Sequence, residues 1–88
     1  MNDKDAARLK RLARNPFADD APLDQVERVA ATLCARGFTL AEIARDMDIG
    51  PSMVNYHVRN VVAKLGLKNK RDLSRRAFAN LRSAINDL

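Results

Sequence analysis

Residues 39–65 carry the pattern that most restricts how this chain can fold. Apolar side chains first recur at the spacing of one helix face, at Leu40, Ile43, Ala44 and Met47. Gly50-Pro51 then starts a second helix, because Pro is tolerated at the first helical position. This second helix has a narrow apolar arc, made of Val54, Val58, Val61 and Leu65. Two helices joined by a tight turn, with one face of the second left free, predict a unit that can lie in the major groove of DNA.

The residues before this unit predict one short helix and a connection. Residues 5–14 are expected to be helical, and Asn15-Pro16 ends the helix because Pro disfavours a helical residue before it. Turn-forming residues and a charge reversal predict a linker over residues 15–22. The sequence therefore divides into an N-terminal helix with its linker, residues 1–21, and a main domain, residues 22–88.

Three pairs of residues predict helix starts, each with a capping acceptor three positions before an acid. They are Asp24 with Glu27, Thr39 with Glu42, and Asn69 with Asp72. The helix after the first pair is expected to bury a stripe of Val26, Val29, Ala30 and Leu33 and to stop at Gly37.

The last helix is expected to begin near Lys70, after a stop at Gly66. Its apolar positions are Leu73, Ala77, Phe78, Leu81, Ile85 and Leu88. No stretch alternates as a strand would. The predicted fold is all-α: a four-helix unit with an extra short N-terminal helix and an extended C-terminal helix.

The charge of the chain is unevenly placed. Residues 1–15 carry five basic and two acidic side chains, residues 16–50 three and seven, and residues 51–88 eight and two, for a net charge of +5. Such a division lets one side face a polyanion while another repels it. A generally basic surface, the alternative, does not predict an acidic block between two basic ones. Double-stranded DNA is the expected partner.

Size and composition argue against several other classes of protein: multidomain, disulfide-bonded, metal-binding, membrane and secreted proteins. Eighty-eight residues make one small domain, and the lone Cys34 forms no internal disulfide. No Cys/His cluster has metal spacing, no stretch has the length of a membrane span, and the start Met1-Asn-Asp-Lys-Asp is too polar for a signal peptide. We expect a cytoplasmic protein that needs no cofactor or metal.

The free face of the helix over residues 51–65 carries side chains suited to reading bases. Arg59 can bridge guanine O6 and N7, Asn55 can bridge adenine N6 and N7, and Tyr56 offers a hydroxyl or a ring edge. This helix contains no acidic residue, as expected for a surface pressed on phosphates. A merely solvated face, the alternative, usually shows Glu and Lys in quantity. The expected DNA-backbone contacts are Thr39, Ser52, Asn60, Lys64, Lys68, Lys70 and Arg71.

Several stretches match a known family pattern: Leu23 with Glu27, Ala35-Arg-Gly37, Thr39-Leu-Ala-Glu-Ile-Ala44, Ile49, and Val54-Asn-Tyr-His57 continuing into Val61-Val-Ala-Lys-Leu65. With this spacing, the segment from Leu23 to about Ala77 resembles the LuxR-type (GerE-type) helix-turn-helix domain of bacterial transcription regulators. The resemblance implies a four-helix domain whose third helix enters the major groove, usually as a dimer on a two-fold operator. It also implies base or groove contacts at Asn55, Tyr56 and Arg59. Asn55 departs from the family, which commonly has Lys there.

The C-terminal helix continues beyond what such a domain needs. Its residues Phe78, Leu81 and Ile85 could pack on Leu9 and Leu12 of the N-terminal helix, or they could pair two copies of the chain. A single short helix contacts too few base pairs for useful discrimination. We therefore expect a homodimer held by Phe78, Leu81 and Ile85, with the N-terminal helix contributing.

A competing interpretation is a protein-interaction module of the same fold, an anti-activator that binds another regulator or RNA polymerase. The acidic block between Asp19 and Asp48 would serve it, together with Phe17 and Leu40 if these are exposed. An enzyme is least expected, because the sequence shows no constellation of nucleophile, base and metal ligand. We expect His57 to be structural and Cys34 to be a buried thiol with no basic residue near it.

Overall fold

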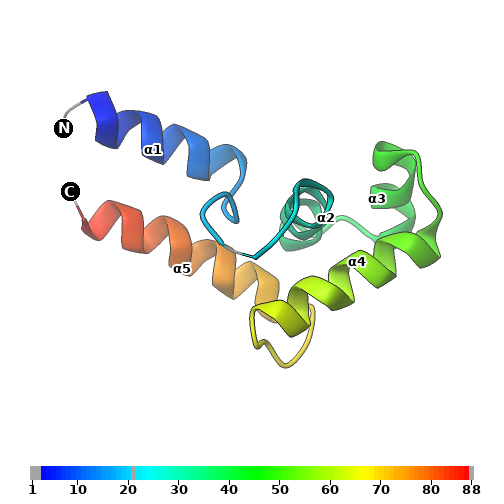
Figure 1. The fold of residues 1–88 in the computed structure, drawn as a ribbon. Coiled ribbons are helices and arrows are strands. Elements are labelled where there is room, and N and C mark those ends of the chain that lie inside the picture. Colours follow the sequence, from blue (N-terminus) through cyan, green and yellow to red (C-terminus); the bar gives the residue numbers. More distant parts are fainter. Residues whose placement is uncertain (1–2, 21, 88) are drawn as a thin grey trace.

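The computed structural model describes residues 3–20 and 22–87, and all regular structure in these ranges is helical. The helices are α1 (Asp3–Arg14), α2 (Gln25–Ala35), α3 (Leu40–Met47), α4 (Pro51–Lys64) and α5 (Asp72–Asn86). Figure 1 shows α2, α3 and α4 gathered at one end, while α1 and α5 run side by side toward the two termini. The predicted all-helical fold, with an extra short N-terminal helix and a long last helix, is confirmed. Leu88, expected on the last apolar stripe, lies outside the described residues.

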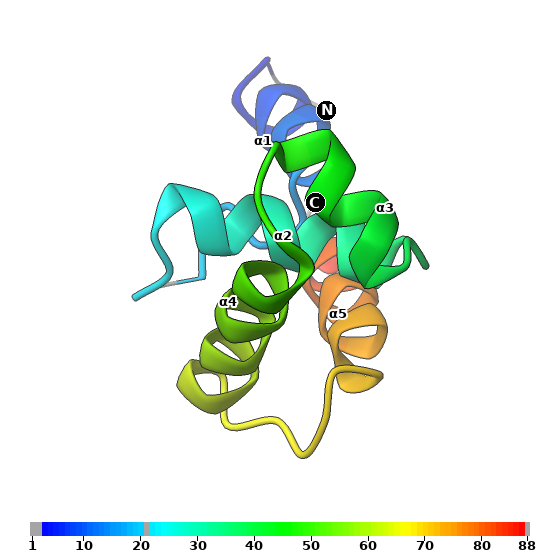
Figure 2. The same cartoon turned by 90° about the vertical axis from the view of Figure 1, so that its right-hand side faces the viewer.

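The main core lies between α2, α3, α4 and the first turns of α5. Val54, Val58 and Val61 of α4 are fully buried, as the apolar arc predicts, and they meet Ile43 of α3 and Leu73 of α5. α2 packs across both α4 and α5. Figure 2 shows α4 and α5 descending from α2 on separate sides, joined at the bottom by the loop that follows α4. One face of α4 is therefore occupied by the core.

Two of the three predicted capping pairs form. Asp24 caps α2, and Thr39 caps α3. In each case the capping side chain accepts a hydrogen bond from the backbone N–H of the Glu three positions on, and the carboxylate of that Glu accepts one from the backbone N–H of the cap. The third prediction was wrong. Asn69 Oδ1 accepts from the backbone N–H of Arg71 at 3.0 Å, so Asn69 shapes a turn and α5 begins at Asp72 without a side-chain cap.

Glu27 is the buried acid of this fold. Its Oε1 accepts from the backbone N–H of Asp24 at 2.9 Å and from Nζ of Lys64 at 2.8 Å. One carboxylate oxygen thus binds the start of α2 to the end of α4. Val26, which the sequence placed on the apolar stripe, is instead 42% exposed. Glu27 faces inward, where it meets Lys64, and its neighbour Val26 lies about 100° further round the helix, on the solvent side.

Residues 15–20 were expected to form a linker, but they pack against the helices. Phe17 is completely buried and belongs to the main core. The two carboxylate oxygens of Asp20 accept hydrogen bonds from Arg76 at 2.7 Å and from Asn80 at 2.8 Å. The expectation that Phe17 could be an exposed docking residue was therefore wrong. A lone aromatic beside Pro16 has no periodicity from which its burial could be predicted.

The position of Glu27 makes a prediction about stability. Glu27→Ala removes a cap and leaves the ammonium of Lys64 without its partner, so the free energy of unfolding should fall by about 2–3 kcal/mol. Urea unfolding followed by circular dichroism measures the loss. Glu42→Ala is the matched control, because Glu42 completes the same kind of capping box on α3 but is fully exposed. The control should lose clearly less, and equal losses would contradict the role given to Glu27.

Candidate nucleic-acid interface

The sequence before α4 fixes where this helix begins. Asp48 adopts the left-handed conformation, with φ 56° and ψ 46°, and the backbone N–H of Ile49 donates to the carbonyl of Ala44 at 3.0 Å. Gly50 is the N-cap of α4 without a side-chain bond, and Pro51 takes the first helical position, as predicted. A connection of three residues, 48–50, therefore joins α3 to α4, and α4 packs on the core with its outer face uncovered.

The outer face of α4 brings the predicted base-reading residues together. Tyr56 is 57% exposed, Arg59 is exposed, and Asn55 is half-buried. A shallow groove of about 440 Å³ runs along this face and is lined by Ser52, Asn55, Tyr56, Arg59, Asn60 and Ala63. All its polar members are donors or neutral acceptors, and α4 contains no acid. The face can hydrogen-bond base edges without repelling phosphates.

A second groove joins α4 to the loop that follows it. It has a volume of about 370 Å³ and includes Asn55 and Arg59 on one side and Lys68 and Lys70 on the other. Its remaining lining is mostly apolar, with Val58, Val62, Ala63 and Leu67, together with Asn69. Two of the predicted backbone contacts therefore lie beside two of the predicted base readers.

The basic loop also reaches the start of α3. Lys70 and Arg71 line a further pocket of about 290 Å³ together with Thr39. Because Lys70 belongs to both this pocket and the groove beside α4, the predicted residues form a continuous band. We call this set the α4 band: Thr39, Ser52, Asn55, Tyr56, Arg59, Asn60, Lys68, Lys70 and Arg71.

Lys64, a predicted DNA-backbone contact, forms an ion pair within the protein. Its Nζ lies 2.8 Å from Oε1 of the buried Glu27, and it does not line the grooves of the α4 band. A phosphate contact by Lys64 would have to compete with this ion pair. The spacing of basic residues around the helix end gave no sign of it, because Glu27 lies 37 positions away in the chain.

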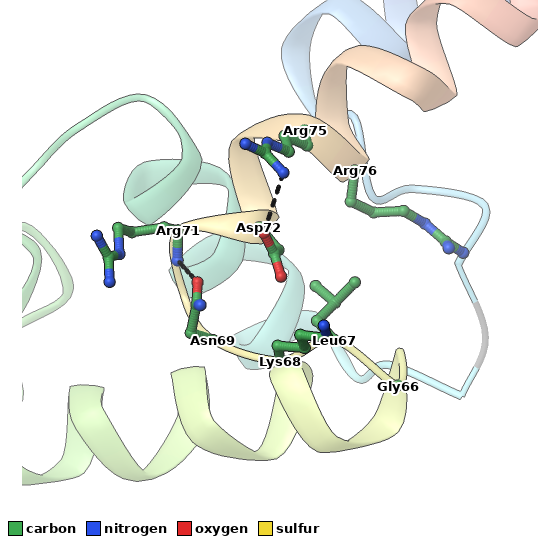
Figure 3. Close-up of a pocket in the computed structure, with 8 residues that line it drawn as sticks. All are labelled: Gly66, Leu67, Lys68, Asn69, Arg71, Asp72, Arg75 and Arg76. Carbon is green, nitrogen blue, oxygen red and sulfur yellow. Dashed lines mark hydrogen bonds and ion pairs between the residues drawn. The ribbon is translucent and has the colours of Figure 1, made fainter.

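Figure 3 shows a pocket of about 770 Å³ beside the same loop, at the start of α5. Its arginine side chains point apart: Arg71 to one side, Arg75 above, and Arg76 toward the residues that precede α2. Arg76 is held by Asp20, and Arg75 lies 3.9 Å from Asp72. The cations do not converge on one point, so this surface suits an extended polyanion better than a small anion. Arg75 was not predicted as a contact, although its place one turn after Arg71 was a usable signal.

His57 and Cys34 are the two residues whose side chains could have a chemical role, and neither has surroundings that would activate it. His57 is half-buried, and its ring meets that of Tyr56 edge-on at 5.5 Å between centroids. Burial raises the pKa of the Cys34 thiol, while the nearby charge of Lys70 acts in the opposite direction. The expectation of no basic neighbour was therefore wrong, but the raised pKa keeps the thiol protonated at neutral pH.

No helix among the described residues has the length and apolar character needed to cross a membrane. Residues 3–20 and 22–87 contain no group of His, Cys, Asp and Glu side chains placed to hold a metal ion. The α4 band is the site that the geometry favours.

The surface expected for the competing interpretation is mostly used inside the molecule. Asp24 caps α2, Asp20 binds α5, and Asp19 pairs with α1. Leu40 is half-buried and packs on the core, and Phe17 is part of the core. Phe17, Leu40 and Asp20 are therefore engaged within the fold, whereas Asp46 and Asp48 stay exposed.

Comparison with known proteins gives one family. The family model described as bacterial regulatory proteins, luxR family, matches residues 22–77. This range covers α2 to the first turns of α5 and includes the whole α4 band. No solved structure matches the chain significantly.

Two kinds of relative are informative. The transcriptional regulatory protein UhpA of Escherichia coli (strain K12) is 39% identical over 57 residues, which are 65% of this chain and 29% of the relative. The transcriptional activator protein EsaR of Pantoea stewartii subsp. stewartii is 38% identical over 63 residues, 72% of this chain and 25% of the relative. The chain thus spans less than a third of the length of these curated relatives.

Proposed function

The chain belongs to the luxR family of bacterial regulatory proteins, and we propose that it is a transcription regulator that binds a specific DNA sequence through α4. The observation that supports this proposal is that α4 has one buried apolar face and one exposed polar face. Val54, Val58 and Val61 anchor one face in the core, while the other face is exposed, polar and free of acids. Such a helix can enter the major groove while staying fixed to its domain.

Three side chains of the α4 band are proposed to read bases. Arg59 has the forked donors that match guanine O6 and N7, and Asn55 has the paired donor and acceptor that match adenine. Tyr56 is the most exposed aromatic of the helix and can reach a phosphate or a thymine methyl. The small side chain of Ala63, in the same groove, lets the helix approach the bases closely.

The remaining members of the α4 band are proposed to hold the DNA backbone. Lys68, Lys70 and Arg71 bring positive charge to one side of the groove, and such contacts add affinity without sequence preference. Ser52 and Asn60 flank the base readers and can donate to phosphate oxygens. Thr39 lies at the start of α3, where the helix dipole favours an anion.

The proposed complex contains two copies of the chain on a two-fold operator. Phe78 and Ile85 of α5 are 66% and 56% exposed, and Leu81 between them is half-buried. These apolar side chains follow one face of α5, and pairing two such faces would remove them from water. Two copies would place their α4 helices about 34 Å apart, one turn of the duplex. A regulator of this kind works on the bacterial nucleoid.

Another regulator or RNA polymerase is a second possible partner of the same molecule. The observation in its favour is the exposed acidic side of α3 and its end, at Asp46 and Asp48, which takes no part in the α4 band. This surface would stay accessible while α4 lies in the major groove of DNA.

The base-reading proposal predicts the behaviour of an Arg59 variant. Arg59→Ala should cost about 1–3 kcal/mol on the preferred duplex, because one bidentate contact is lost, and should relax the base preference at that position. The preferred duplex comes from selection among random sequences, and fluorescence anisotropy gives the affinities for it and for an unrelated duplex.

Lys68→Ala is the matched control for this experiment. It should weaken both duplexes by the same factor and lower the slope of log K against log salt by about 0.9 for one lost phosphate contact. If Arg59→Ala weakened both duplexes equally, base reading by Arg59 would be wrong. If no sequence were preferred by the wild type, the proposed function would fall with it.

The dimer proposal has its own variant. Ile85→Asp places a charge on the proposed contact, so sedimentation should show a folded monomer that binds DNA weakly and no longer prefers inverted repeats. Ala79→Asp, exposed on another face of the same helix, should leave dimer and preference unchanged. A wild-type chain that sediments as a monomer with and without DNA would rule out the dimer.

A further inference from the structure

The outer half of α5 lies beyond the main core. The core takes in Leu73 and Ala77, in the first turns of this helix. Ala84, two turns further on, is also buried, yet it does not belong to that core. The helix beside it is α1, whose Leu12 is buried and is likewise outside the core (Figure 1). The burial of the end of α5 therefore depends on α1.

Polar contacts hold α1 at its middle and at its end. In the middle, Arg8 pairs with Asp87, just past α5, at 3.1 Å. At the end, Nη2 of Arg36 donates to the last carbonyls of α1, at 3.1 Å to Ala13 and 3.0 Å to Arg14. These bonds satisfy carbonyls that the helix itself leaves free. They fix α1 alongside α5 and not at another angle.

The following connection is fastened to the middle of α5. Nδ2 of Asn80 donates to the carbonyl of Pro16 at 2.9 Å and to the carboxylate of Asp20 at 2.8 Å. The second oxygen of Asp20 accepts from Arg76 at 2.7 Å. Because Phe17 is buried in the main core, this connection would stay in place even if α1 came away.

The contact of α1 itself is weak compared with the core. Leu12 is the one side chain of α1 that the structure buries. Arg8 and Asp87 are both more than a third exposed, and exposed ion pairs add little stability. A pocket of about 90 Å³ lies beside α1, lined in part by Arg8, Asp19 and Ser83. A helix held by one buried leucine, exposed ion pairs and two exposed hydrogen bonds from Arg36 can leave while the rest of the fold persists.

We propose that α1 is a switch for the outer half of α5. Docked, it buries Ala84 and keeps residues 78–86 helical, so that Phe78 and Ile85 stand on one rigid face. Released, it leaves those turns without tertiary packing, and an unsupported helix end frays. The use of this face for pairing two copies rests on the proposed function, so docking of α1 would control whether the regulator assembles.

The test uses the full chain with Leu12→Asn, which removes the buried anchor of α1. Ala13→Asn is the matched control, since Ala13 is the exposed neighbour in the same helix. Amide hydrogen exchange of residues 81–86 should become roughly ten-fold faster in Leu12→Asn and stay near the wild-type rate in Ala13→Asn. Amides of α4 should be unchanged in both, which shows that the core is intact. Leu12→Ala serves in its place if Leu12→Asn fails to fold.

Sedimentation of the same variants completes the test. The dimer fraction should fall in Leu12→Asn and not in Ala13→Asn. Equal exchange of residues 81–86 in the two variants would overturn the proposal, and so would faster exchange with an unchanged dimer fraction. A wild type that never dimerises would end the proposed assembly, whereas equal weakening of both duplexes by Arg59→Ala would overturn base reading alone, so the two failures are distinguishable.

Discussion

The position of α4 depends on one carboxylate. Oε1 of Glu27 accepts two hydrogen bonds, one from the first turn of α2 and one from Lys64 at the end of α4. A buried carboxylate is costly unless it is bound in this way, so the two helices are held together by a group that neither can release cheaply. Three fully buried valines then set the rotation of α4 about its axis. The outer face follows from these two constraints.

The fold places the acidic and the basic segments of the sequence in different roles. Most acids of residues 16–50 take part in contacts that stabilise the fold. Asp20 binds α5, Asp24 and Glu27 form the capping box of α2, and Glu42 completes that of α3. The basic loop after α4, in contrast, keeps Lys68 and Lys70 exposed beside Arg59. The positive side is thus available to a polyanion, while Asp20 and Glu27 are paired with basic side chains of the fold.

The sequence predicted best what depends on neighbours within a helix. The buried arc of α4 and the capping boxes at Asp24 and Thr39 follow from spacing, and the family follows from the resemblance of residues 23–77 to its pattern. What it missed depends on distant residues. Nothing local marks Lys64 as the partner of Glu27, and nothing near Phe17 marks it as core. Asn69 misled for a different reason, since an Asn two residues before a backbone donor shapes a turn as readily as a helix cap. The roles assigned to the α4 band are still predictions.

The most direct test of the account is a map of backbone amide chemical shifts when a ¹⁵N-labelled chain is titrated with duplex DNA. With a selected duplex, the largest changes should fall on the outer face of α4 and on residues 66–71, and α1 should change little. With a shuffled duplex, changes in the basic loop should persist while those at Asn55, Tyr56 and Arg59 shrink, because phosphate contacts carry no sequence information. Changes concentrated on the acidic side of α3 or on α1, with α4 unaffected, would contradict the claim that α4 reads DNA.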